Sequence, residues 1–202
     1  MFALVESGSI TRMLSGKKGI TIGDLQYPKE IFTLWTKSER EAIGVYEVEM
    51  DTSKRKDEAW YTNTDVTYSF GSGKVTGSYG DATAKAHADT LFTAQDETDG
   101  LGTEGEVKTR GLKYNLIQNI KRKAAGELQN TDWYVVRKAD AGTAVPSAIT
   151  IHRAAVRTKC AEMETAITNA SDTPSLETLY TYTKQEDGSI TRPLGELPRL
   201  ES

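Results

Sequence analysis

LKYNLIQNIKRKAAGEL, residues 112–128, carries apolar side chains three or four positions apart. This spacing gathers the apolar residues on one stripe of an α-helix and leaves the polar residues on the rest of its surface. The stripe consists of Leu112, Leu116, Ile117, Ile120, Ala124 and Leu128. We therefore expect an amphipathic helix over about 107–129.

A second apolar stripe follows Pro146, a residue that suits a first helical turn because its missing amide needs no partner there. The stripe consists of Ile149, Val156, Cys160, Met163 and Ile167. Two amphipathic helices that are close in sequence can bury their stripes against each other. The sequence thus predicts an antiparallel helical hairpin joined by the segment Thr131 to Val145.

Upstream of these helices the apolar residues alternate with a period of two, which favours β-strands. Phe2–Glu6 and Ile10–Leu14 flank a Ser-Gly-Ser turn, and Val66–Phe70 and Lys74–Tyr79 flank Gly-Ser-Gly. Glycine-containing turns of this length are typical of β-hairpins, so two hairpins are expected. Val45–Met50 alternates apolar or aromatic residues with acidic ones and predicts a further strand with one wet face.

One short helix is expected between the two hairpins. Thr36 and Glu39 have the spacing of a capping box, in which each side chain bonds the other's backbone amide. Gly44 is placed to end that helix. The N-terminal region is therefore predicted to be a small β-rich module with one short helix.

Acidic residues gather in the middle of the chain. Residues 81–106 contain one basic residue, Lys85, and the acidic residues Asp81, Asp89, Asp96, Glu97, Asp99, Glu104 and Glu106. The stretch 94–106 is also rich in Gly and Thr, which disfavours a regular helix or strand. The sequence therefore predicts an α+β chain in four parts: a β-rich module at 1–93, an acidic Gly/Thr linker at 94–106, a helical hairpin at 107–170 and a C-terminal extension at 171–202.

Composition excludes several classes of function. The chain has 25 basic and 29 acidic residues and a net charge of -4, which argues against electrostatic binding to nucleic acid or to an anionic membrane. It contains no apolar run long enough to span a bilayer. The N-terminus lacks the basic start and apolar middle of a secretion signal, so we expect a protein made and kept in a cytoplasm unless another particle carries it out.

No arrangement of reactive residues predicts catalysis. One cysteine and two histidines are too few for a disulfide or a Cys/His zinc site, and no glycine loop has the ending of a phosphate-binding loop. His87 and His152 are expected at the surface or partly satisfied, and Cys160 in the core. Asp96–Gly100 lacks the ligand order of a calcium loop. We expect no catalytic residue, cofactor or metal.

Lys121-Arg122-Lys123 is the densest basic run. Three consecutive residues point in different directions around a helix, so the run is expected to be a solvated surface rather than a nucleic-acid site.

The segment Asn130-Thr131-Asp132 should end the first long helix, and Trp133-Tyr134 follows it directly. A large aromatic pair at this place has two interpretations. It packs the elbow of the hairpin, or it forms a docking surface in the manner of an interface hot spot. The sequence leaves both open.

Two stretches together resemble a known family. The N-terminal part, Phe2-Ala3-Leu4-Val5-Glu6, Tyr27-Pro28 and then Trp35 to Val48, resembles small bacteriophage tail proteins of the tail fibre assembly type. The part from Leu128 through Asp132-Trp133-Tyr134-Val135-Val136-Arg137-Lys138 and Pro146 to Arg157 is similar to the C-terminal helical hairpin of those proteins. The resemblance covers roughly 1–50 and 108–170.

The resemblance implies a non-enzymatic structural protein of the phage tail, fibre or baseplate, assembled in the host cytoplasm and carried in the virion. Its partners would be other tail or tail fibre proteins and, in a symmetric assembly, copies of itself. It also implies an interface whose residues are Trp133, Tyr134, Arg137, Arg153 and Arg157. The alternative is a tail fibre assembly chaperone in the host cytoplasm; residues 51–106 and 171–202, additional to a minimal family member, favour the virion component.

Overall fold

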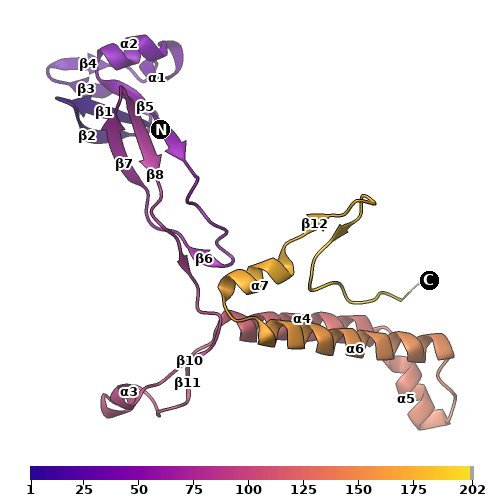
Figure 1. Cartoon of the computed structure of the whole chain (residues 1–202). Coiled ribbons are helices and arrows are strands. Elements are labelled where there is room, and N and C mark those ends of the chain that lie inside the picture. Colours follow the sequence, from indigo (N-terminus) through magenta and orange to yellow (C-terminus); the bar gives the residue numbers. More distant parts are fainter. Residues whose placement is uncertain (201–202) are drawn as a thin grey trace. The chain divides into compact units, whose positions relative to one another are not determined.

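Residues 1–200 are described by a computed structural model, in which the chain divides into two compact units, Met1–Thr83 and the part from Ala84 onward. The fold is α+β, as the sequence predicts. The boundary lies after Thr83 and not after residue 93, because residues 86–92 bond to the segment that leads into the first long helix. Figure 1 shows the elements of each unit.

A curled five-stranded sheet forms the N-terminal unit. Its order is β2-β1-β5-β8-β7, in which only β5 and β8 are parallel. The strands are β1 (Phe2–Glu6), β2 (Ser9–Leu14), β5 (Val45–Asp51), β7 (Thr67–Gly71) and β8 (Lys74–Ser78). Edge strands β2 and β7 approach each other, so the sheet curls toward closure.

Both predicted hairpins are confirmed, β1–β2 and β7–β8. Their turns place two consecutive residues at positive φ: Ser7 (51°) with Gly8 (78°), and Ser72 (50°) with Gly73 (73°). Such turns match the right-handed twist of the flanking strands. The glycine signal in the sequence therefore has a direct conformational cause.

Side chains that alternate along β1 belong to two apolar clusters. Leu4 packs with Leu14, Ile31, Phe32 and Val45, whereas Ala3 and Val5 pack with Val75. Successive side chains of a strand point to opposite faces, so one strand supplies both clusters.

Two short helices lie between β2 and β5, where the sequence predicts one. The capping box at Thr36 and Glu39 is confirmed and starts α2 (Lys37–Ala42). The additional helix α1 (Ile31–Leu34) has no side-chain cap and therefore no local signal in the sequence, yet it buries Ile31 and Phe32. The smaller elements of this region are β3 (Ile20–Ile22), β4 (Leu25–Tyr27), β6 (Tyr61–Thr62) and β9 (Thr83–Ala84).

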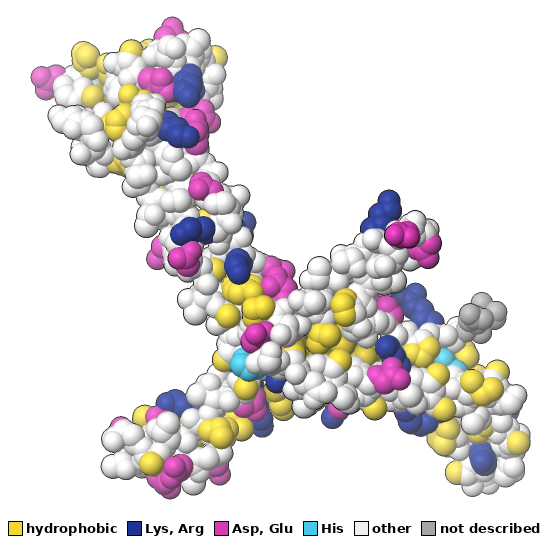
Figure 2. Space-filling view, viewed as in Figure 1, with side chains coloured by type: hydrophobic (Ala, Val, Ile, Leu, Met, Phe, Trp, Pro, Cys, Tyr) yellow, Lys and Arg dark blue, Asp and Glu magenta, His cyan; other side chains and the backbone are white. Residues whose placement is uncertain are grey.

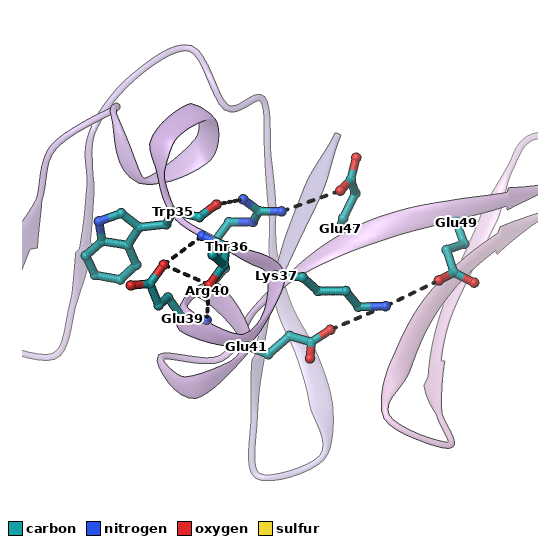
Figure 3. A network of polar contacts seen from close by, with 8 residues as sticks. All are labelled: Trp35, Thr36, Lys37, Glu39, Arg40, Glu41, Glu47 and Glu49. Atoms are coloured by element: carbon teal, nitrogen blue, oxygen red, sulfur yellow. Dashed lines mark hydrogen bonds and ion pairs between the residues drawn. The ribbon is translucent and has the colours of Figure 1, made fainter.

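A polar network fixes α2 on β5 (Figure 3). Arg40 donates to the carbonyl oxygen of Trp35 and lies 3.6 Å from a carboxylate oxygen of Glu47. Lys37 lies 3.7 Å from Glu41 and 3.8 Å from Glu49. The charged residues of this segment therefore join the short helix to the strand that follows it.

The acidic segment predicted as a linker is ordered, which corrects that expectation. Strands β10 (Thr90–Leu91) and β11 (Val107–Thr109) pair, and α3 (Ala94–Thr98) lies between them. Thr93 and Asp96 form a capping box, which stabilises the start of α3 although glycine and threonine are frequent around it. We call residues 89–109 the acidic arm.

Lys108→Met is expected to raise the pKa of Asp96 from about 2 toward its ordinary 3.8, because the hydrogen bond from Lys108, at 2.6 Å, is the largest cause of the lowering. The Thr93 amide, the next cause, remains. A folded pKa below the unfolded one stabilises the arm above about pH 3.8, and this contribution is lost as the pH falls through about 2. A carboxyl-carbon NMR titration of Asp96 checks this, and an unchanged pKa in the variant would contradict it.

The second unit is built on two long helices, α4 (Leu112–Gln129) and α6 (Ser147–Asn169). Three contacts join the helices, and their positions move forward along α4 while they move backward along α6. They are Lys113 to Thr168, Lys121 to Glu164, and Leu128 to Arg153. The antiparallel hairpin is thus confirmed, and Figure 1 shows the helices side by side. The predicted stripe of α6 is buried over its whole length. Helix α4 begins at Leu112 rather than at 107 because Val107–Thr109 pair as β11.

The segment from 171 to 200 packs on this unit at both ends, whereas residues 181–191 are exposed. It contains α7 (Thr173–Tyr180), β12 (Thr183–Lys184) and β13 (Ile190–Thr191). The hydroxyl of Thr173 donates to the carbonyl oxygen of Lys85 at 2.6 Å, and Leu176 and Leu194 are buried. Within residues 1–200, none of the helices has the length and hydropathy needed to span a bilayer.

Candidate protein interface

The connection between α4 and α6 contains a ten-residue helix, α5 (Asp132–Ala141). Asn130 caps the end of α4, and the buried Thr131 separates the two helices. Gly142 ends α5 at a φ of 67°, a left-handed conformation that a glycine adopts without strain. The predicted end of the first long helix at Asn130-Thr131 is therefore confirmed, but a new helix begins at once with Asp132.

Arg153 of α6 holds this elbow together. Its Nη1 donates to the carbonyl oxygen of Leu128 at 2.9 Å and to the hydroxyl of Thr131 at 2.6 Å, and its Nη2 lies 2.8 Å from Asp132 Oδ1. The Leu128 carbonyl oxygen also accepts from the Thr131 amide at 3.0 Å and from the Thr131 hydroxyl at 2.8 Å, so the guanidinium adds a charged donor to it. One side chain thus joins the end of α4 to the start of α5.

Trp133, Tyr134 and Arg137 form a stack on α5. The two aromatic ring centroids are 3.9 Å apart with an interplanar angle of 32°, and the Arg137 guanidinium lies 4.6 Å from the centre of the Trp133 ring and 5.4 Å from that of Tyr134. Among the described residues, Nε of Arg137 is buried without a hydrogen-bond partner. The stack limits the rotamers of all three side chains, which lowers the entropy that a partner must remove on binding.

Helix α5 buries none of its residues. Trp133 is 50% exposed and Val136 is 65% exposed, and Figure 2 shows hydrophobic side chains over this part of the molecule. A helix with this apolar content normally packs a face against its own protein. Helix α5 thus presents an apolar surface that the described chain leaves uncovered.

The structure separates the five predicted interface residues by environment. Trp133, Tyr134 and Arg137 lie together on α5, and Arg157 is exposed on α6. Arg153, by contrast, has a side chain only 9% exposed, and its donors are used within the chain. Its role is to position α5, which corrects the expectation that it faces a partner.

Of the two predicted alternatives for His152, a surface position is wrong. Its side chain is buried, and its Nε2 has no hydrogen-bond partner within residues 1–200. Cys160 is buried as predicted, and burial together with the hydrogen bond to Glu164 raises its thiol pKa. In the basic run, Lys121 pairs with Glu164 at 3.1 Å.

A groove beside α4 has a volume of about 1000 Å³. We call it the α4 groove. Its lining comes from α4, α6 and the segment 180–199, and its apolar part consists of Leu116, Ile120, Met163, Tyr180, Leu194 and Leu197. No sequence motif predicts it, because the segments that line it are far apart in the chain.

Within residues 1–200, no group of three or more His, Cys, Asp or Glu side chains is arranged to hold a metal ion. Comparison with family models, with curated proteins and with solved structures finds no match to this chain.

Proposed function

We propose that the chain is a non-enzymatic structural component of a bacteriophage tail, carried in the virion, and that α5 contacts another tail or fibre protein. The observation that supports this proposal is the uncovered apolar surface of α5, which carries Trp133, Tyr134, Val135 and Val136. Aromatic residues beside arginine are the composition typical of interface hot spots. The resemblance of 1–50 and 108–170 to tail proteins supplies the class of partner.

Mass spectrometry of purified phage particles tests the proposal. We expect the chain at a fixed ratio to the major tail proteins, because a structural component occupies a defined number of symmetric positions. Absence from particles together with abundance in the infected-cell lysate would contradict the virion assignment and favour an assembly chaperone.

Trp133→Ala is expected to reduce incorporation into particles at least tenfold, since a central aromatic anchor typically contributes about 2 kcal/mol or more to binding. Because Trp133 is half exposed, the thermal stability of the free chain should change little. Tyr114→Ala is the matched control, as it removes another exposed aromatic stacked on an arginine, Arg110, at 4.2 Å. Equal loss of incorporation in both variants would contradict a specific interface on α5.

A further inference from the structure

The α4 groove has a preorganised wall. Arg192 lies 5.2 Å from the ring centre of Tyr180 and 5.1 Å from that of Tyr182, and its Nε is 2.8 Å from Glu196 Oε1. The hydroxyl of Tyr182 donates to the same carboxylate at 2.5 Å. This network holds the two ends of the segment 180–196 together, so this wall of the groove needs little rearrangement to receive an occupant.

The rim of the groove carries unused positive charge. Arg122, Lys123 and Arg199 line it, and none of them has an ion-pair partner in the part of the chain that the structure describes. Of the two acidic residues in the lining, Glu196 is paired with Arg192. Only Glu127 remains to offset the three basic residues. An occupant that is apolar in the middle and acidic at its edges therefore fits this surface.

The acidic arm has the complementary composition. Leu101, which is 60% exposed, lies between acidic residues, and Leu91 and Val107 are also exposed. Asp96 and Asp89 are paired with Lys108 and Arg110. The carboxylates that have no basic partner within residues 1–200 are Glu97, Asp99, Glu104 and Glu106.

We propose that the α4 groove receives the acidic arm of a second copy of this chain, with Leu101 in the apolar part and the free carboxylates on the basic rim. Because groove and arm are different surfaces, the contact is head-to-tail and generates a ring if its rotation closes and a filament if it does not. The inference deepens the proposed function by specifying how copies meet. It involves residues outside α5, so the contact between copies and the contact of α5 with a tail protein can be disproved separately.

Sedimentation of the full chain over a range of concentrations tests the contact. We expect the chain to associate at low salt, with a Kd that rises at least tenfold at high salt, because the rim contacts are exposed charges. A groove variant (Arg122→Gln, Lys123→Gln, Arg199→Gln) and an arm variant (Glu97→Gln, Glu104→Gln, Glu106→Gln) should each remain monomeric. Asp24→Asn, Glu30→Gln and Asp65→Asn, exposed in the other unit, give a matched control that should associate as the wild type.

Mixing the two monomeric variants provides the decisive measurement. The arm variant keeps a native groove and the groove variant keeps a native arm, so the mixture should form a 1:1 heterodimer that grows no further. Formation of this dimer also shows that both variants are folded. As a milder change, Leu101→Asp should weaken association of the otherwise native chain at least tenfold, and Trp133→Ala should leave it unchanged.

A wild-type chain that is monomeric at every concentration would overturn the proposal. So would association that persists in the groove variant, or a mixture that forms no heterodimer. If the triple variants unfold, an unchanged Kd for Leu101→Asp would overturn it by itself.

Discussion

Gly44→Ala is expected to lower the free energy of unfolding of the N-terminal unit by about 3 kcal/mol, through a disfavoured φ and a backbone clash together. Gly44 has a φ of 79°, and a Cβ at this position would lie 2.6 Å from the carbonyl oxygen of Val5. That oxygen cannot move away easily, because the Val5 amide donates to the Gly44 carbonyl at 2.8 Å. The clash therefore falls on the junction between α2 and the sheet.

Gly8→Ala is the control for the conformational part of this effect. Gly8 has nearly the same φ, 78°, but a Cβ at this position would have no other atom within 4 Å. We expect a loss of about 1 kcal/mol there. Urea unfolding followed by NMR signals of each unit measures both variants, and equal losses would contradict the argument from the Val5 carbonyl.

Arg153→Met is expected to destabilise the helical unit by about 3 kcal/mol. The substitution leaves the Leu128 carbonyl without its charged donor and removes the partner of Asp132, while it keeps much of the apolar volume. Because the same guanidinium bonds Thr131, the angle of α5 should also become less defined.

Arg157→Met, one helical turn further along α6, is the matched control. Arg157 is exposed, so its substitution should change the free energy of unfolding by less than about 0.5 kcal/mol. Urea unfolding compares the two variants, and amide hydrogen exchange in α5 reports on the elbow. Unfolding midpoints that agree for Arg153→Met and Arg157→Met would show that Arg153 does not hold the elbow.

The elements that could be predicted from the sequence are those with local causes. The two hairpins follow from glycine turns, α2 follows from the spacing of Thr36 and Glu39, and the long helices follow from their apolar stripes. In each case the residues that specify the element lie within or next to it. Helix α3 has the same kind of local signal in Thr93 and Asp96, but its glycine-rich surroundings favour the opposite prediction.

Features that depend on distant residues could not be predicted. Helix α1 exists because Ile31 and Phe32 complete a cluster with strands on either side of it in sequence. The inward direction of Arg153 depends on Leu128 and Thr131, which lie in a different part of the chain.

The candidate interface on α5 could be predicted from the sequence, whereas the α4 groove could not. Trp133, Tyr134 and Arg137 are neighbours on one helix, so their clustering follows from sequence spacing. The α4 groove needs α4, α6 and the segment 180–199 in place together.

The parallel pairing of β5 with β8 has a consequence for the rate of folding. Val48 lies beside Val75, so this pairing must close a long stretch of chain that includes β7. The β7–β8 hairpin forms from neighbouring residues, whereas its docking on β5 waits for the slower loop closure. Until that closure, β5 has an unpaired edge on the side that β8 covers in the native sheet.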